Sequence, residues 1–268
     1  MSEVLQLEFF RTALQASLLI GLMLSLMGVY VVLRRIIFVG AALAQISAAG
    51  VALGVLLGLH GETVGMAAAL LGVALLSIRP KRVSLPSEGP IAVGYALAST
   101  LAILLVAKTP GGESDTLLLL YGNILAIPRW HLVELYVLVP ILVAVHLVFR
   151  REFLSVSFSP DSAQAAGVRV TAWTLLLYAT LGVGIAAGMD IAGSLLTFAY
   201  LVLPALSGQM LARRSWHMPA IAVGLALVGT AAGLFASVLW DLPSGPSIVA
   251  ALAAETGLAW GAARLLHA

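Results

Sequence analysis

The sequence predicts an all-α fold, a polytopic helical membrane protein, on three observations. Hydrophobic residues make up 61% of the 268 residues and charged residues only 10%, whereas about a quarter of the residues of a soluble domain are charged. The mean hydropathy is +1.08. Apolar runs of roughly 20 residues, enough to cross a bilayer core about 30 Å thick, follow one another along the chain. We therefore expect residues 1–268 to form a single transmembrane domain with no soluble catalytic domain.

Charged residues mark the ends of the membrane spans, because a charge at the bilayer centre costs several kcal/mol. We predict about nine transmembrane helices, at Thr12–Leu33, Ile36–Leu59, Thr63–Ile78, Pro90–Ala107, His131–Phe149, Thr171–Met189, Ile191–Leu211, Met218–Leu239 and Pro246–Ala263. Only Asp190 separates the sixth span from the seventh. Eight spans plus a broken helix are therefore the alternative.

Two features interrupt this regular pattern. The apolar stretch 116–127 is too short to cross the bilayer, so we predict a re-entrant or interfacial helix there. Pro140 and Pro204 lie inside predicted spans. Because proline removes a backbone donor, both are candidates for breaks in their helices.

The basic residues predict the orientation, since lysine and arginine accumulate on the cytoplasmic side. With the N-terminus outside and the C-terminus inside, most of the 14 lie inside. The inside positions are Arg34, Arg35, Arg79, Lys81, Arg82, Arg150, Arg151, Arg169, Arg213, Arg214 and Arg264. Only Arg11, Lys108 and Arg129 fall outside, and the sequence pI near 9.2 therefore reflects loop arginines rather than a nucleic-acid surface.

The motifs of several enzyme classes are missing from the sequence. It has no phosphate-binding Gly-Lys-Ser/Thr, no Gly-x-Ser-x-Gly, no His-Glu-x-x-His and no cysteine. The histidines are dispersed, and we interpret each as interfacial or packed: His60, His131, His146, His217 and His267. The sequence therefore predicts a protein that is not itself an enzyme.

The longest cytoplasmic loop, 150–170, carries the pattern of one short capped helix. Ser159 or Asp161 suits the N-cap, Pro160 the first turn, and Gly167 a left-handed C-terminal residue. A capped helix that projects from the basic side of a membrane protein has the shape of a docking element for a soluble partner.

Several segments, in this order and spacing, resemble the zinc/manganese family of bacterial ABC transporter permeases over nearly the full chain. The matching segments are Val32–Arg35, Phe38–Gln45, Gly50–Gly54, Leu120–Ala126, Ser159–Asp161 with Gly167–Val168, Leu201–Ala205 and Asp241–Ser247. The resemblance implies the permease subunit of an importer for divalent metal ions, zinc or manganese, in the prokaryotic inner membrane.

The resemblance also implies the partners. A homodimer of the chain would dock on cytoplasmic ABC ATPase subunits, which bind ATP and magnesium, while the chain itself binds no cofactor. An extracytoplasmic binding protein would deliver the substrate. The helix at Ser159–Val168 would be the coupling helix, and ATP binding would open a pathway at the dimer interface alternately to either side.

The sequence departs from this family at its usual metal ligands. Members usually have Asp at the position of Ala41 and His at that of Gln45, four residues apart on one helix face. The family's outer Asp is Asn123 here, and a frequent His in the fourth span is replaced near Ala96. Divalent ions prefer carboxylate and imidazole ligands, so these positions form a poor capture site.

Three explanations stay open. In the first, the pathway only passes the ion, through oxygen atoms of Gln45, Ser47 and Asn123. In the second, the acids Asp190 and Glu255 have taken over the role of the missing metal ligands. The third is a different cargo, such as a metal chelate or a small organic solute. An intramembrane acid is a candidate functional residue, although Glu255 can equally be a protonated group bonded to a neighbouring helix.

A different class of function also stays open. A secondary transporter that couples its cargo to protons through Glu255 or Asp190 would need no ATPase. Removing the helix at Ser159–Val168 would leave such a carrier active, whereas it would uncouple an ATP-driven importer.

Overall fold

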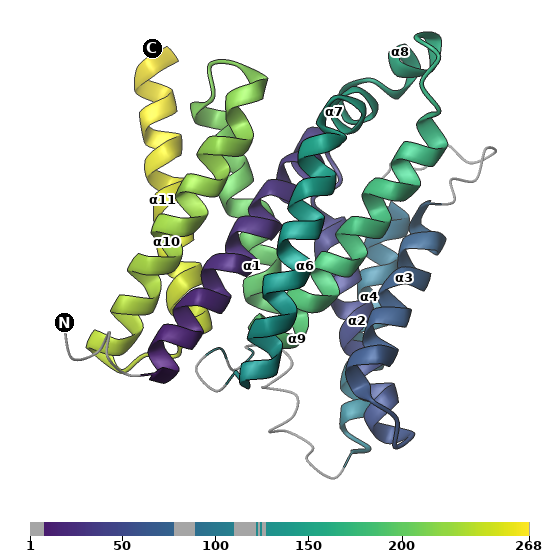
Figure 1. Ribbon diagram of the computed structural model, residues 1–268, viewed down its shortest axis with the longest axis vertical. Helices are drawn as coiled ribbons and strands as arrows, with labels where there is room; N and C mark the ends of the chain where they lie inside the picture. Colours follow the sequence, from purple (N-terminus) through teal and green to yellow (C-terminus); the bar gives the residue numbers. More distant parts are fainter. Residues whose placement is uncertain (1–7, 78–88, 110–121, 123, 125–126, 268) are drawn as a thin grey trace.

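Helices account for nearly all of the described residues, which are 8–77, 89–109, 122, 124 and 127–267 of the computed structural model (Figure 1). The helices are α1 Glu8–Leu33, α2 Phe38–Leu56, α3 Gly61–Ser77, α4 Gly89–Val106, α6 Arg129–Val148, α7 Arg150–Phe158, α8 Pro160–Ala165, α9 Val170–Leu211, the 3-10 turn η3 Ser215–His217, α10 Met218–Trp240 and α11 Ser244–His267. The predicted all-α fold is confirmed.

Helix α9 folds back on itself at Gly193. A straight helix of 42 residues would be ~63 Å long, about twice the apolar thickness of a bilayer. Gly193 has non-helical backbone angles, φ 76° and ψ 167°. A side chain added at Gly188 would lie 3.2 Å from Thr197 Oγ1, nine residues further on, so the two halves run side by side as two arms.

The fold-back accounts for the number of spans. Seven described helices are long and apolar enough to cross a membrane, and α3 is a shorter apolar helix. With α9 counted as two arms, the described residues contain nine apolar segments, in agreement with the predicted spans. The sequence pattern predicts the break at Asp190. In the structure it lies three residues further on, at Gly193.

Helix α1 is the most buried of the membrane helices and lies in the middle of the bundle. It packs against α6, α9 and α10, while α2 packs against α3 and α4, and α11 against α9 and α10. In Figure 1, α2, α3 and α4 therefore stand on one side of the bundle and α10 and α11 on the other. The peripheral helices α4, α6 and α11 bury little of their surface and present it outward.

Close backbone approach and hydrogen bonds between helices hold this arrangement, as expected where lipid removes the hydrophobic drive for helix association. Gly28 of α1 packs directly on the backbone of Leu201 in the second arm of α9. The fully buried hydroxyl of Tyr200 lies 2.8 Å from Thr230 Oγ1 on α10. The second arm is thus fixed to both α1 and α10.

Two features of the structure differ from the sequence predictions: the two prolines inside helices and the helix α7. Pro140 and Pro204 lie inside α6 and α9, whose only non-helical interior residue among those described is Gly193, so the predicted breaks at these prolines are wrong. Helix α7, which buries Phe153, was not predicted. Most of the stretch 116–127, proposed as a re-entrant helix, lies outside the described residues.

Candidate functional site

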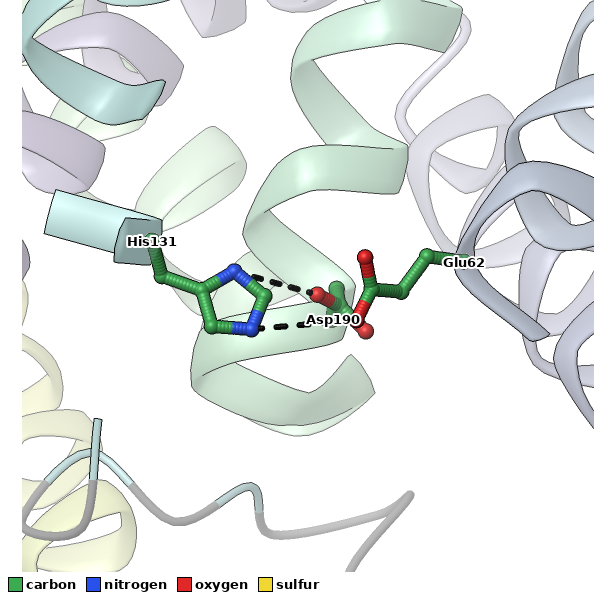
Figure 2. A group of neighbouring side chains, drawn as sticks. All are labelled: Glu62, His131 and Asp190. Carbon is green, nitrogen blue, oxygen red and sulfur yellow. Dashed lines mark ion pairs between the residues drawn. The ribbon is translucent and has the colours of Figure 1, made fainter. Parts of the chain in front are cut away.

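Three helix ends bring acidic and imidazole side chains together at the end of the bundle opposite α7 and α8. Glu62 lies in the first turn of α3, after the tight α2–α3 connection, and His131 in the first turn of α6, after Pro128. Asp190 lies three residues before the fold-back of α9. Figure 2 shows the His131 ring facing the carboxylates of Asp190 and Glu62, which lie on the same side of it.

The polar atoms of this cluster lie close together but beyond hydrogen-bond distance. His131 Nε2 is 3.8 Å from Glu62 Oε1, and Nδ1 is 3.7 Å from Asp190 Oδ2. Glu134, one turn further along α6, places its Oε2 3.7 Å from the same Nδ1. The His131 side chain is only 12% exposed, whereas that of Glu62 is 50% exposed. The cluster thus lies at the boundary between the bundle and solvent.

The donor set suits a divalent cation. One ligand atom from each of Glu62, His131 and Asp190 lies within 4.8 Å of the others. An imidazole nitrogen with carboxylate oxygens is a typical ligand set for zinc and other borderline divalent metals. The His131 ring also stacks on Trp130, with 3.5 Å between ring centroids, and this contact restricts its orientation.

The structure brings only one of the predicted pathway residues, Asp190, into this cluster. Ala41 and Gln45 are half-buried on α2, and the buried Ser47 packs against Gly65 of α3. Asn123 lies outside the described residues.

Glu255 lies apart from the cluster, between α11 and α10. A side chain added at Gly229 of α10 would lie 2.9 Å from its Oε2. This oxygen is buried and has no hydrogen-bond partner in the part of the chain that the structure describes. The roles of Glu255 and of the other pathway candidates stay predictions.

Sequence reasoning missed Glu62 and His131, although a signal for them was available. Both lie beside the outer ends of predicted spans, as does Asp190, so the predicted topology already placed all three at the same end of the bundle. Because each histidine was interpreted singly, the proximity of His131 to the two acids was not predicted.

The predicted local geometry of helix α8 is confirmed at the other end of the bundle. Ser159 is the N-cap, with its Oγ accepting a 3.3 Å bond from Ser162 N, Pro160 is in the first turn, and Asp161 follows it. Gly167 has φ +81°, and Val168 N bonds to Ala163 O at 3.0 Å while Gly167 N bonds to Gln164 O at 3.0 Å. This is a Schellman motif, so both ends of α8 are fixed by the local sequence.

Helix α7 connects α8 to the centre of the bundle. Its Phe153 is fully buried and packs edge-on against the rings of Tyr30 on α1 and Trp173 on α9. Arg34, at the end of α1, donates a bond to Val156 O of α7. Beside Arg34, a cavity of about 940 Å³ is lined by residues of α1, α3, α7, α8 and the start of α9.

Together, this fold and these two ends define a polytopic membrane protein of the transport-permease class. The model of the ABC 3 transport family matches residues 6–256, so the chain belongs to that family and the resemblance to metal ABC transporter permeases is confirmed.

Named relatives and a solved structure agree with this assignment. The manganese transport system membrane protein MntC of Halalkalibacterium halodurans is 26% identical, over 92% of this chain and 85% of MntC. The manganese import system permease protein ScaB of Streptococcus pneumoniae is 29% identical, over 91% of this chain and 87% of ScaB. The fold matches the structure of PsaBC from Streptococcus pneumoniae in complex with Fab, with a TM-score of 0.85, 22% identity, and coverage of 97% of this chain and 93% of that one.

Proposed function

We propose that the chain is the permease subunit of an ATP-driven importer for a divalent metal ion, manganese or zinc. Family membership and the names of the relatives, several of them manganese permeases, support this proposal. The ligand types at the end opposite α8 favour the free ion over a chelate, because carboxylate and imidazole groups bind an ion directly. Two copies of the chain, two ATPase subunits and an extracytoplasmic binding protein form the working complex.

Helix α8 is the observation that carries the ATP-driven part of the proposal. It projects from the bundle, its two ends are fixed by its own caps, and α7 connects it to α1 and α9. A rigid element of this kind transmits a push from a soluble partner into the membrane helices. Because the sequence has no phosphate-binding loop, the energy of ATP has to come from such a partner.

In this mechanism the end with α8 faces the cytoplasm and the Glu62–His131–Asp190 end faces outside, with the N-terminus outside. ATP binding draws the two ATPase subunits together and moves the α8 helices of the dimer. This motion opens the pathway between the two permease copies alternately to the outside and the inside. The binding protein hands over the metal ion at the outer end.

Uptake of radioactive Mn²⁺ and Zn²⁺ tests this function in cells that lack their own importers and express the chain with its ATPase and binding protein. We expect uptake that stops when the ATPase carries an inactivating substitution and when residues 159–168 are deleted. Detection of the membrane-inserted chain shows that each variant is produced. Metal uptake that persists without the active ATPase contradicts the proposal and favours a proton-coupled carrier.

A further inference from the structure

We propose that Glu62, His131 and Asp190 form a binding site for one divalent cation at the outer mouth of the permease. The substrate ion pauses at this site before it moves deeper into the bundle. The role as a loading site rests on the proposed function, whereas binding of the ion depends only on the geometry of the three side chains.

The geometry needs little adjustment to hold an ion. Around a metal with ligand distances of ~2.1 Å, neighbouring ligand atoms lie ~3.0–3.4 Å apart. One ligand atom from each of Glu62, His131 and Asp190 lies within 4.8 Å of the others, so side-chain movement of about 1–2 Å brings them to these separations. The three side chains come from α3, α6 and α9, so they approach a common point from different directions.

The histidine has a second partner that suits a ligand. A ring binds a metal through one nitrogen, and the other nitrogen usually donates to a carboxylate or carbonyl group that orients the ring. Glu134 Oε2 faces Nδ1 at 3.7 Å from the same helix. With Nδ1 directed to Glu134, Nε2 is the ligand atom beside Glu62. The Asp190 carboxylate, which lies 3.7 Å from Nδ1, then turns toward the ion at Nε2. Glu134 is thus a positioning residue.

The cluster lacks the bonds that a purely structural ion-pair network would have. Among the described residues, Glu62, Glu134 and Asp190 form ion pairs with His131 only, at 3.7 to 3.8 Å, and their carboxylates make no hydrogen bonds. Three carboxylates around one imidazole repel one another, and a bound divalent cation removes this repulsion.

The chemistry of the ligands selects the class of ion. Calcium and magnesium prefer oxygen ligands alone, and copper(I) prefers sulfur, whereas one imidazole with two carboxylates suits manganese, zinc and cobalt. The site is also separate from positions 41 and 45. Gly54 packs at Gly61, next to Glu62, and Gln45 lies nine residues before Gly54 on α2, which places it ~13 Å deeper along the helix.

Binding by the purified full-length chain in complex with its ATPase, in detergent, tests this site. Co²⁺ is titrated by its visible absorption, and free Mn²⁺ is followed by electron paramagnetic resonance. We expect one ion per chain, and affinities at least tenfold weaker in Glu62→Gln, His131→Ala and Asp190→Asn. His60→Ala removes a neighbouring exposed histidine outside the cluster and is the matched control, with unchanged affinity.

A further variant separates binding from folding. His131→Lys places an ammonium group among the carboxylates in place of the imidazole ligand, so it should melt at the wild-type temperature and bind neither ion. Wild-type affinity in His131→Lys and Asp190→Asn overturns the site, as does a wild-type protein that binds no ion. Tight binding without ATP-dependent uptake refutes the proposed function alone, and uptake without this binding refutes the site alone.

Discussion

The guanidinium group of Arg34 donates a 2.9 Å hydrogen bond to the hydroxyl of Thr174, which joins the end of α1 to the start of α9. A second bond, 3.2 Å long, runs from the same nitrogen to the carbonyl oxygen of Val156 in α7. The guanidinium also lies over the ring of Tyr178, 5.4 Å from its centroid. Arg34 therefore connects three helices at the place where movement of α8 would reach the bundle.

Replacing Arg34 should uncouple ATP hydrolysis from transport. In Arg34→Ala, α7 loses its bond to α1, so we expect uptake to fall at least fivefold while the assembled complex still hydrolyses ATP. Thr174→Val, which keeps the volume and removes one acceptor, should act in the same direction with a smaller effect. The ratio of metal ions transported to ATP hydrolysed measures this coupling.

Arg35→Asn is the control for the neighbouring charge. Arg35 is exposed and has φ 56°, a backbone conformation that asparagine tolerates. We expect coupling in this variant to equal that of the wild type. Equal coupling in Arg34→Ala and Arg35→Asn would show that the bonds of Arg34 transmit nothing.

The contact of Gly28 with Leu201 predicts a sharp size limit on α1. In Gly28→Ala, the new Cβ collides with the carbonyl oxygen of Leu201, which is backbone and cannot turn away. Overpacking of this kind costs about 1–3 kcal/mol, so the melting temperature of the purified protein should drop. Gly224→Ala on α10 adds the same methyl group into open space, so the melting temperature of this variant should equal or exceed that of the wild type. Equal melting temperatures of the two variants would contradict the α1–α9 packing.

Gly193→Ala tests the fold-back of α9. The backbone angles at Gly193, φ 76° and ψ 167°, belong to a region occupied almost only by glycine. We expect a loss of about 1–3 kcal/mol in stability, together with weaker metal binding, because Asp190 lies three residues away. Thermal melting and Co²⁺ titration measure the two effects. A variant with wild-type stability would argue against this conformation.

Replacement of Glu255 should stabilise the protein, in contrast to the substitutions at Gly28 and Gly193. Its Oε2 is buried beside Gly229 and has no hydrogen-bond partner among the described residues. Because an unpaired buried polar group costs free energy, Glu255→Leu should raise the melting temperature. Metal uptake by Glu255→Gln should stay within twofold of the wild type. Loss of uptake in Glu255→Gln would instead make this carboxyl part of the metal pathway.

The sequence predicts the membrane helices because their lengths depend on a simple quantity, the apolar thickness of the bilayer. It also predicts α8, because Ser159, Pro160 and Gly167 act on their immediate neighbours. In both cases the determinant lies within the segment itself.

The remaining features depend on contacts between distant segments. The break of α9 lies at Gly193 rather than at Asp190, because the conformation of the chain, and not its charge, decides where two packed arms can reverse. Glu62, His131 and Asp190 are 59 to 128 residues apart in the sequence, and each is unremarkable in its own segment. Only the packing of α3, α6 and α9 brings them together.

Metal accumulation in proteoliposomes that contain the permease, its ATPase and the binding protein tests the proposed function most directly. Vesicles carry ATP on the side of the ATPase, and Mn²⁺ is loaded on the binding protein outside. We predict accumulation that requires ATP and that is reduced at least tenfold in His131→Lys but not in His60→Ala. Accumulation driven by a proton gradient without ATP would contradict an ATP-driven importer.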